Sequence, residues 1–243
     1  MARPVINSLL GGLALSLCAG SALAGDRAAI DIIGYSEDGR YFAFEEFGVQ
    51  DGSGFAYANI FLIDLAKDGW VSGTPVKVRA DSEARPLHSI RAEAQGKFAQ
   101  YVARFALHQP GELIAMIGDG VPDNDGTTLE FGAVGFSGPG SVQNRNVLTL
   151  ESLAVPASAD CASWSDSEIK GFALSLTSDD ATTELHRDTR LPASRGCALD
   201  YRLYGVAVPF PGWSIEGGVA LVSVYSLGFE GPDRRFLAVP LDQ

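Results

Sequence analysis

Short apolar runs separated by polar turns make up much of the chain, and two runs near its N-terminal end form the clearest unit. A polar turn at residues 36–40 precedes the apolar run 41–44, and a second apolar run covers residues 60–65. Aromatic and β-branched residues favour strands, and the Asp-Gly pair in the turn tolerates positive φ. The pattern predicts a β-hairpin with a long loop over residues 48–59, where functional residues are often found.

The same arrangement returns near the C-terminal end, with a turn before the apolar run 219–222 and a second run at 236–241. Three pairs of like residues are each 178 positions apart: Ser36 and Ser214, Gly39 and Gly217, and Asp64 and Asp242. One supersecondary unit is therefore predicted at both ends of the chain, with chance matching of short hydrophobic hairpins as the alternative.

Between the two units, residues 86–107 have apolar side chains at helical spacing and are predicted to form one α-helix. Pro86 suits the first turn, and Pro110-Gly111 ends the pattern. The apolar face consists of Ile90, Ala94, Phe98, Tyr101, Val102 and Phe105. The opposite face, which we expect to be solvated, carries Arg91, Glu93, Gln95, Lys97 and Arg104.

From residue 111 to residue 208 the chain alternates short strand-like runs with turns and shows no crossover helices. Antiparallel pairing follows, because a parallel sheet needs such helices. The candidate strands are 113–117, 147–153, 170–177, 183–187 and 198–208. The predicted fold class is mainly β, with antiparallel strands in a β-sandwich or propeller-like array and one α-helix. We expect a single domain over residues 25–243, since no linker divides it.

The first 24 residues have the features of a secretory signal peptide. Arg3 supplies the basic start, residues 9–17 are apolar, and a small-residue end stops at Ala24, so cleavage is expected between Ala24 and Gly25. The apolar run is shorter than the ~20 residues of a transmembrane helix, so no membrane span is expected in the mature chain. Acylation of Cys18 is a poor alternative, because a leucine precedes it. The predicted location is the periplasm or the medium.

The net negative charge argues against nucleic acids and anionic lipid surfaces as partners. Removing residues 1–24 removes Arg3 and no acidic residue, so the formal charge of −12 becomes −13. Nucleic-acid binding requires a basic patch that releases counterions from phosphates, and an anionic lipid surface is disfavoured for the same reason of sign. The simplest role of the charge is to keep an exported protein dispersed.

Two cysteines remain after cleavage, Cys161 and Cys197, in a compartment that permits oxidation. A disulfide between them is the expected outcome. It would stabilise the fold by roughly 4 kcal/mol on the chain-entropy model. A reactive or metal-binding thiol is the alternative, but neither cysteine lies in a Cys-x-x-Cys pair or near a histidine.

Motifs for hydrolysis are missing from the sequence. The nearest matches to Gly-x-Ser-x-Gly, at 135–139 and 212–216, both lack the last glycine. His88, His108 and His186 could serve as a base in a dispersed triad, but without a defined nucleophile we expect ordinary surface or loop histidines. Their spacing also lacks the pattern of a zinc site. No cofactor is expected.

A pair of acidic residues, Glu45-Glu46, lies at the end of the first predicted strand. Neighbouring strand residues point to opposite faces, so the two carboxylates cannot act together on one glycosidic bond. We expect an exposed strand on which acidic residues alternate.

A weak calcium candidate lies in the Gly-rich segment 118–126, which offers Asp119, Asp123 and Asp125 as oxygen donors. An EF-hand register starting at Val121 would lack its first acid and would place Gly132 where the bidentate glutamate belongs. A plain turn is therefore the favoured interpretation.

Aromatic residues in Gly-rich segments suggest binding loops, with Phe55 and Tyr57 in the first hairpin and Phe229 beside Glu230 in the last. Rings with polar neighbours could stack on glycans or peptides, so a glycan or a protein of the cell envelope is the candidate partner. For any single ring taken alone, we expect core packing. The predicted function is a non-catalytic extracytoplasmic binding or structural protein. The alternative is a hydrolase acting on cell-envelope or extracellular material.

Two resemblances accompany these patterns. The sequence Ser-x-Asp-Gly-Arg-Tyr-x-Ala-Phe, followed by a strand ending in Ile-Asp-Leu, resembles the hairpins of TolB-like and peptidase-type β-propeller blades. The mature chain as a whole resembles an uncharacterised bacterial family of predicted secreted proteins, through the stretches 33–48 and 228–236. That second resemblance implies export and a shared fold, and it assigns no catalytic residue.

Overall fold

The structure is a computed structural model that describes residues 25–119, 125–156, 161, 163 and 167–242. The predicted signal peptide, which includes Ala24, and the calcium candidate Asp123 lie outside the described residues. The described chain forms three antiparallel sheets and one α-helix. This confirms the predicted mainly β class.

The first sheet, called here the N-terminal sheet, has the strand order β1-β2-β3-β4, with β5 also paired to β3. Its strands are β1 (Ala29–Tyr35), β2 (Tyr41–Val49), β3 (Ala56–Asp64), β4 (Gly69–Trp70) and β5 (Val76–Arg79). The helix α1 (Leu87–Phe105) covers one face of this sheet.

The central sheet has the order β13-β12-β11-β6, and the outer sheet has the order β10-β9-β8-β7. The central strands are β6 (Gly111–Met116), β11 (Ala198–Pro209), β12 (Val219–Ser226) and β13 (Asp233–Pro240). The outer strands are β7 (Thr128–Val134), β8 (Val142–Ala154), β9 (Lys170–Ser178) and β10 (Ala181–Arg187).

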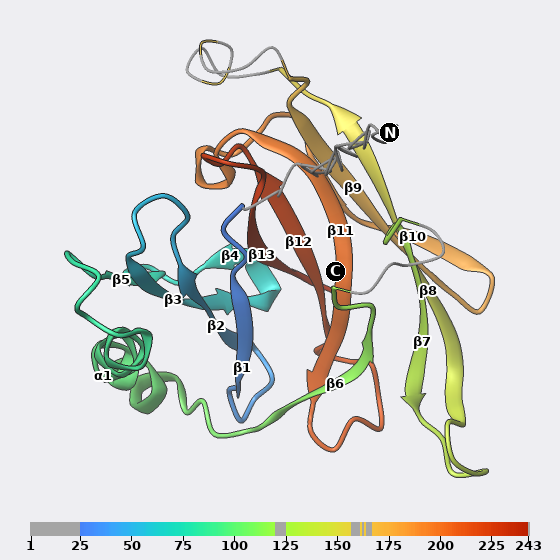
Figure 1. Ribbon diagram of the computed structural model, residues 1–243. Helices are drawn as coiled ribbons and strands as arrows, with labels where there is room; N and C mark the ends of the chain where they lie inside the picture. The colour runs from blue at the N-terminus through green and yellow to red at the C-terminus, as the bar shows by residue number, and fades with distance from the viewer. Residues whose placement is uncertain (1–24, 120–124, 157–160, 162, 164–166, 243) are drawn as a thin grey trace, which may run out of the picture.

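Four layers stack in the order α1, N-terminal sheet, central sheet, outer sheet (Figure 1). An apolar core fills each of the three spaces between them. Phe98 of the helix and Ile60 belong to the first core, Phe44 and Leu221 to the second, and Val222 and Leu174 to the third. Burying a large apolar side chain contributes about 1.5–3 kcal/mol, so these cores hold the layers together.

The two hairpins predicted from the 178-residue spacing are both present, as β2–β3 and β12–β13. Their pairing registers differ, since Tyr41 pairs with Asp64 whereas Val219 pairs with Pro240 rather than with Asp242. The shift is even-numbered, so each side chain keeps its face of the sheet. The hairpins lie in neighbouring layers and pack against each other through one core.

Two expectations about architecture are corrected. The described sheets are stacked in layers and form no radial array of blades, so the sandwich-like alternative holds and the propeller alternative is wrong. The first hairpin also has a shorter loop than predicted, because β2 runs to Val49 and β3 begins at Ala56. Residues 48–49 and 56–59 of the predicted loop instead extend the pairing of the strands.

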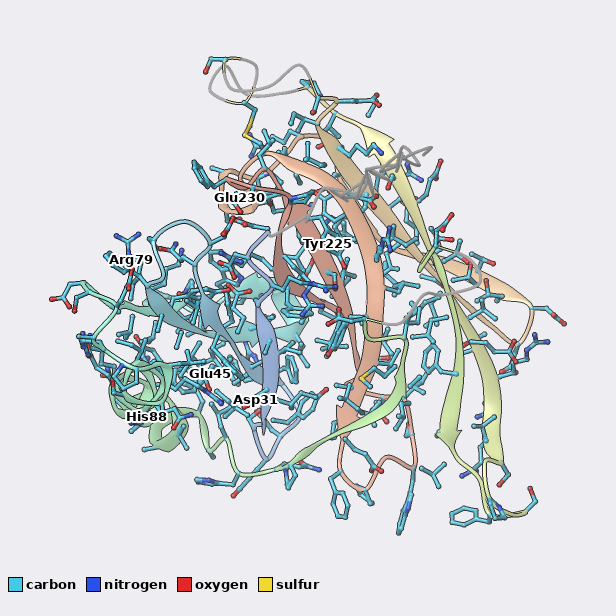
Figure 2. The ribbon with its side chains drawn as sticks, viewed as in Figure 1. Asp31, Glu45, Arg79, His88, Tyr225 and Glu230 are labelled. Atoms are coloured by element: carbon cyan, nitrogen blue, oxygen red, sulfur yellow. A yellow bond between two sulfur atoms is a disulfide. The ribbon has the colours of Figure 1, made fainter. Side chains whose placement is uncertain are left out.

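The helix is confirmed, with its predicted apolar face on the N-terminal sheet, but part of its polar face is not solvated. Arg91 and Gln95 both donate hydrogen bonds to the carboxylate of Glu45, which is 1% exposed. Figure 2 shows Glu45 on the side of the sheet that faces the helix, and Asp31 of β1 also accepts a hydrogen bond from Arg91. Glu46 is buried on the opposite face, against the central sheet. The prediction of an exposed strand was wrong, because this strand lies between two layers.

The predicted disulfide between Cys161 and Cys197 is present, with a Cα–Cα distance of 5.5 Å. Cys197 directly precedes β11, so the bond ties the segment after β8 to the start of a central strand. Among the described residues, no helix has the length and apolar character needed to cross a membrane.

Candidate functional site

A groove of about 740 Å³ lies at the end of the molecule where the turns β1–β2 and β11–β12 meet. In Figure 1 both turns are at the lower end of their sheets, beside the start of β6. The groove walls come from residues 37–40, from residues 209–218, and from the C-terminal end of β13. The equivalent turns of the two related hairpins thus line one hollow, which we call the turn groove.

The first of these turns is held by its own side chains. Ser36 Oγ accepts a hydrogen bond from the Tyr41 amide at 2.9 Å and donates one to Asp38 at 2.5 Å, and Asp38 also accepts from the Arg40 amide at 3.1 Å. Gly39 has a φ of +70°, a conformation that other residues rarely adopt. These bonds hold the pKa of Asp38 below its usual range, with Ser36 as the largest cause.

The second turn repeats this design with different bonds. Gly217 has a φ of +68°, and its amide donates to the Asp242 carboxylate at 2.5 Å. The Glu216 amide donates to Ser214 Oγ at 3.1 Å. A Cβ on Gly217 would lie 3.8 Å from the carbonyl oxygen of Gly39, so the two turns are in contact range.

Two large rings stand exposed in the wall of the turn groove, Phe210 at 55% and Trp213 at 65% exposure. Their backbone is well anchored: the Phe210 amide donates to the Pro110 carbonyl at 2.8 Å, and Gln109 Nε2 donates to the Phe210 carbonyl at 2.8 Å. Gly212, between the rings, has a φ of +72°, which other residues rarely adopt, and a Cβ there would lie 2.6 Å from a carboxylate oxygen of Glu112. The rings are therefore presented on a fixed support.

The turn groove is acidic. Its walls contain one basic side chain and four carboxylates, which are Glu37, Asp38, Glu216 and Asp242. The basic residue, Arg40, is already bound to Asp64 through two hydrogen bonds of 2.8 and 3.1 Å. The bond from Arg40 is the largest cause of the lowered pKa of Asp64. The groove consequently offers a ligand exposed rings and unneutralised carboxylates.

An apolar extension adjoins the groove through the turn between β7 and β8. The Val134 amide donates to the Gly212 carbonyl at 3.3 Å, which joins this turn to the ring-bearing turn. Phe136, 79% exposed, and the exposed Val142 lie beyond it. Large apolar side chains that gather at one end of a protein are typical of an interaction surface.

A second hollow, of about 300 Å³, lies between β4, β10 and β13, and we call it the His186 cleft. His186 Nε2 lies 3.0 Å from Asp188 Oδ1, and its Nδ1 lies 3.9 Å from Asp68. Arg195 binds Asp188 and also lies 3.3 Å from His186 Nε2. Ser194 lines the same cleft. His186 was expected to be an ordinary surface or loop histidine; it lies in β10 and belongs to a charge network.

This network fixes the charge of His186. Burial favours the neutral imidazole, but the hydrogen bond to Asp188 and the nearby carboxylate of Asp68 outweigh that effect and raise the pKa of His186 to about 8. A general base for a serine nucleophile needs a ring nitrogen free to accept a proton. Both ring nitrogens here lie near carboxylates, with Nε2 also 3.3 Å from Arg195, and the raised pKa favours the protonated ring in this network at neutral pH.

The residues predicted as binding loops are separated by the fold. Phe229, 81% exposed, lies over Gly52, and Figure 2 shows Glu230 at the end of the molecule opposite the turn groove. Phe55 is half-buried against the helix core. Tyr57 is buried and donates to Asp26 at 2.9 Å.

The other predicted site residues are placed as follows. Asp119 accepts a hydrogen bond from Arg234, and Arg27 lies 3.8 Å from it, so cations already surround this carboxylate. Asp125 has a positive φ of 56°, as in a turn. Within the described part of the chain, no group of three or more His, Cys, Asp or Glu residues is arranged to hold a metal. Gly25 packs tightly against Pro232.

Sequence reasoning missed the turn groove, although it had found both of its turns. One signal was present: Phe210 and Trp213 lie within a few residues of Pro and Gly, where the chain turns and cannot bury them in a strand. The stacking of the sheets decides which turns lie side by side, and no local sequence pattern predicts this stacking.

The fold defines a mainly β protein with stacked antiparallel sheets, stabilised by a disulfide. A family model described as "Predicted secreted protein (DUF2259)" matches residues 43–242, and the chain belongs to this family. Searches of curated proteins and of solved structures found no match. The family and the disulfide agree on a periplasmic or secreted protein. The likeness of the hairpins to TolB-like propeller blades has no support from these comparisons.

Proposed function

We propose that this protein is a non-catalytic extracytoplasmic binding protein and that the turn groove is its ligand site. The observation that carries the proposal is the pair of exposed rings, Phe210 and Trp213, on anchored backbone beside a groove of about 740 Å³. Ligand sites are concave, with apolar walls and a few fixed polar groups. The turn groove has this composition, since prolines and aromatic rings alternate in it with carboxylates.

A hydrolase acting on envelope material is the second candidate, and the His186 cleft is the feature that favours it. Ser194, His186 and Asp188 are the residue types of a catalytic triad and lie in one region. Against this stands the geometry of His186, whose ring nitrogens are both turned toward carboxylates. The turn groove is also the larger hollow of the two.

A panel of soluble glycans and peptides tests the proposed function, with binding followed by calorimetry and products by mass spectrometry. We expect at least one probe to bind with a Kd of about 1–100 μM and to remain intact. Trp213→Ala and Phe210→Ala should each weaken that binding about tenfold or more, because aromatic anchors dominate such sites.

Phe229→Ala is the matched control, because it removes a ring at least as exposed from the opposite end of the molecule. It should leave the affinity unchanged. Binding that survives both groove variants, cleavage of a bound probe, or a panel without any binder at millimolar concentration would overturn the proposal.

A further inference from the structure

We infer that the ligand of the turn groove is a positively charged peptide segment of a partner protein, whose lysine or arginine side chains lie between the groove carboxylates and the exposed rings. This inference rests on the proposed function and specifies the chemistry of its ligand. It is carried by the charge of the groove, by the two rings, and by the apolar extension beside them.

The four carboxylates of the groove form two pairs, one bonded to backbone amides and one without bonding partners among the described residues. Asp38 and Asp242 accept hydrogen bonds from the amides of Arg40 and Gly217, so they hold the turns. The side chains of Glu37 and Glu216 are exposed and have no hydrogen bond or ion pair to any described residue. These two glutamates are therefore free to pair with a ligand.

A groove of this charge selects cations. Its only basic lining residue, Arg40, is hydrogen-bonded to Asp64, which also lies 3.6 Å from Lys67, so the four lining carboxylates outnumber the cations beside them. An anionic ligand would face four carboxylates at short range, and their repulsion disfavours it most strongly at low salt. Complementary charge also speeds the encounter with a basic partner.

The exposed rings add a second, independent preference for cations. A guanidinium or ammonium group is attracted to the face of Trp or Phe within about 6 Å, with Trp the strongest partner. The protein already uses this contact internally, with Arg91 3.6 Å from the centre of the Phe47 ring and Arg235 4.7 Å from that of Tyr57. Within the described chain, no cation lies over Phe210 or Trp213.

The size and continuation of the groove favour a peptide over a small amine. Its volume of about 740 Å³ exceeds what one amine fills, and the apolar extension around Val134 and Phe136 continues from it. An extended peptide advances about 3.3 Å per residue, so a short segment reaches both regions. Basic residues would occupy the groove, and apolar residues would cover Phe136.

The test compares two blocked peptides that alternate leucine with either arginine or citrulline, which has nearly the same shape as arginine but no charge. Binding is measured by calorimetry and by tryptophan fluorescence, with Trp213→Phe as the reference that isolates the Trp213 signal. We expect the arginine peptide to bind at least about tenfold more tightly than the citrulline peptide, and its affinity to fall with added salt.

Two double variants with equal net charge separate the groove from general attraction to an acidic protein. Glu37→Gln/Glu216→Gln removes the free groove carboxylates and should weaken the arginine peptide about five- to tenfold. Glu83→Gln/Glu151→Gln removes two exposed carboxylates that do not line the groove and should change the affinity by less than about twofold. All four side chains are exposed, so folding should be preserved.

The outcomes distinguish failure of this inference from failure of the proposed function. Equal binding of the two peptides, no binding of the arginine peptide, or equal weakening by the two double variants would overturn the inference. A neutral oligosaccharide whose binding depends on Trp213 would overturn it while leaving the proposed function intact. An arginine peptide that binds independently of Trp213 and of both groove glutamates would overturn both.

Discussion

A single histidine connects three structural layers of the protein. His186 of the outer sheet contacts Asp188 next to it and Asp68 beside the N-terminal sheet, near Arg195 at the edge of the central sheet. Its pKa is raised to about 8 in the folded protein, against 6.5 for an unperturbed histidine. The folded state therefore binds this proton more tightly than the unfolded state does.

The raised pKa predicts how stability depends on pH. The contribution of His186 is fully present below about pH 6.5 and is lost as the pH rises through about 8. It amounts to roughly 1–2 kcal/mol after allowance for partial exposure. Urea unfolding at about pH 6 and about pH 9 should show this loss in the wild type and not in His186→Gln. His88→Gln is the control, because His88 is exposed and its replacement should leave the pH dependence of stability as in the wild type. An unchanged pH slope in His186→Gln would contradict the assignment of this dependence to His186.

Between the helix and the N-terminal sheet, one buried ion pair fixes how the two elements dock. Glu45 is 1% exposed, and Arg91 holds it with hydrogen bonds of 2.8 and 3.1 Å. Removing one partner of a buried pair costs far more than the pair contributes, because a charge remains buried without compensation. The helix is thus bound to the sheet by polar contacts as well as by its apolar face.

Replacing Arg91 should expose this dependence. We expect Arg91→Met to lower the free energy of unfolding by about 3–5 kcal/mol in urea denaturation. Arg85→Met is the matched variant, since Arg85 pairs with the partly exposed Glu93 on the same helix. That variant should cost less than about 1 kcal/mol. Similar losses in the two variants would mean that Glu45 does not need its partner.

Elements were predictable wherever the signal is local. The Asp-Gly turn, the helix with its proline start, and the antiparallel runs all follow from residue types and spacing, and each was found. The length of the β2–β3 loop was not predictable from the same rules. Glycine and polar residues usually mark a loop, but here residues 48–49 and 56–59 are paired in strands. The residue types at these positions do not predict strand pairing, because the pairing here is stabilised by contacts with the rest of the fold.

The candidate site was predictable only in part, for a related reason. Both turns and the free glutamates are visible in the sequence, but their meeting depends on how the central sheet stacks on the N-terminal sheet. Burial on both faces of β2 has the same origin and explains why Glu45 and Glu46 were expected to be exposed. Long-range stacking leaves no periodic trace in a single sequence.

For the whole molecule, the disulfide between Cys161 and Cys197 is the one covalent cross-link between side chains in the described part of the chain. The bond closes a loop with a sequence separation of 36 residues, which contains β9 and β10. On the chain-entropy model a loop of this length contributes roughly 4 kcal/mol, by reducing the freedom of the unfolded chain.

The double variant Cys161→Ser/Cys197→Ser should therefore lose roughly 4 kcal/mol of stability in urea denaturation. Wild-type protein unfolded in the presence of a reductant is the internal control, because it should match the variant. A loss below about 1 kcal/mol would show that the unfolded chain is already compact or that the native bond is strained.

The central claim is that ligand binds in the turn groove and not in the His186 cleft, and the molecule holds a natural reporter in each. Trp213 lines the groove, and Trp70 lines the cleft. The most direct measurement is NMR of ¹⁵N-labelled indole groups, assigned by Trp→Phe variants, during titration with the arginine peptide. We predict that the Trp213 signal shifts in a saturable way while the Trp70 signal stays in place. A saturable shift of Trp70 with Trp213 unmoved would contradict the account.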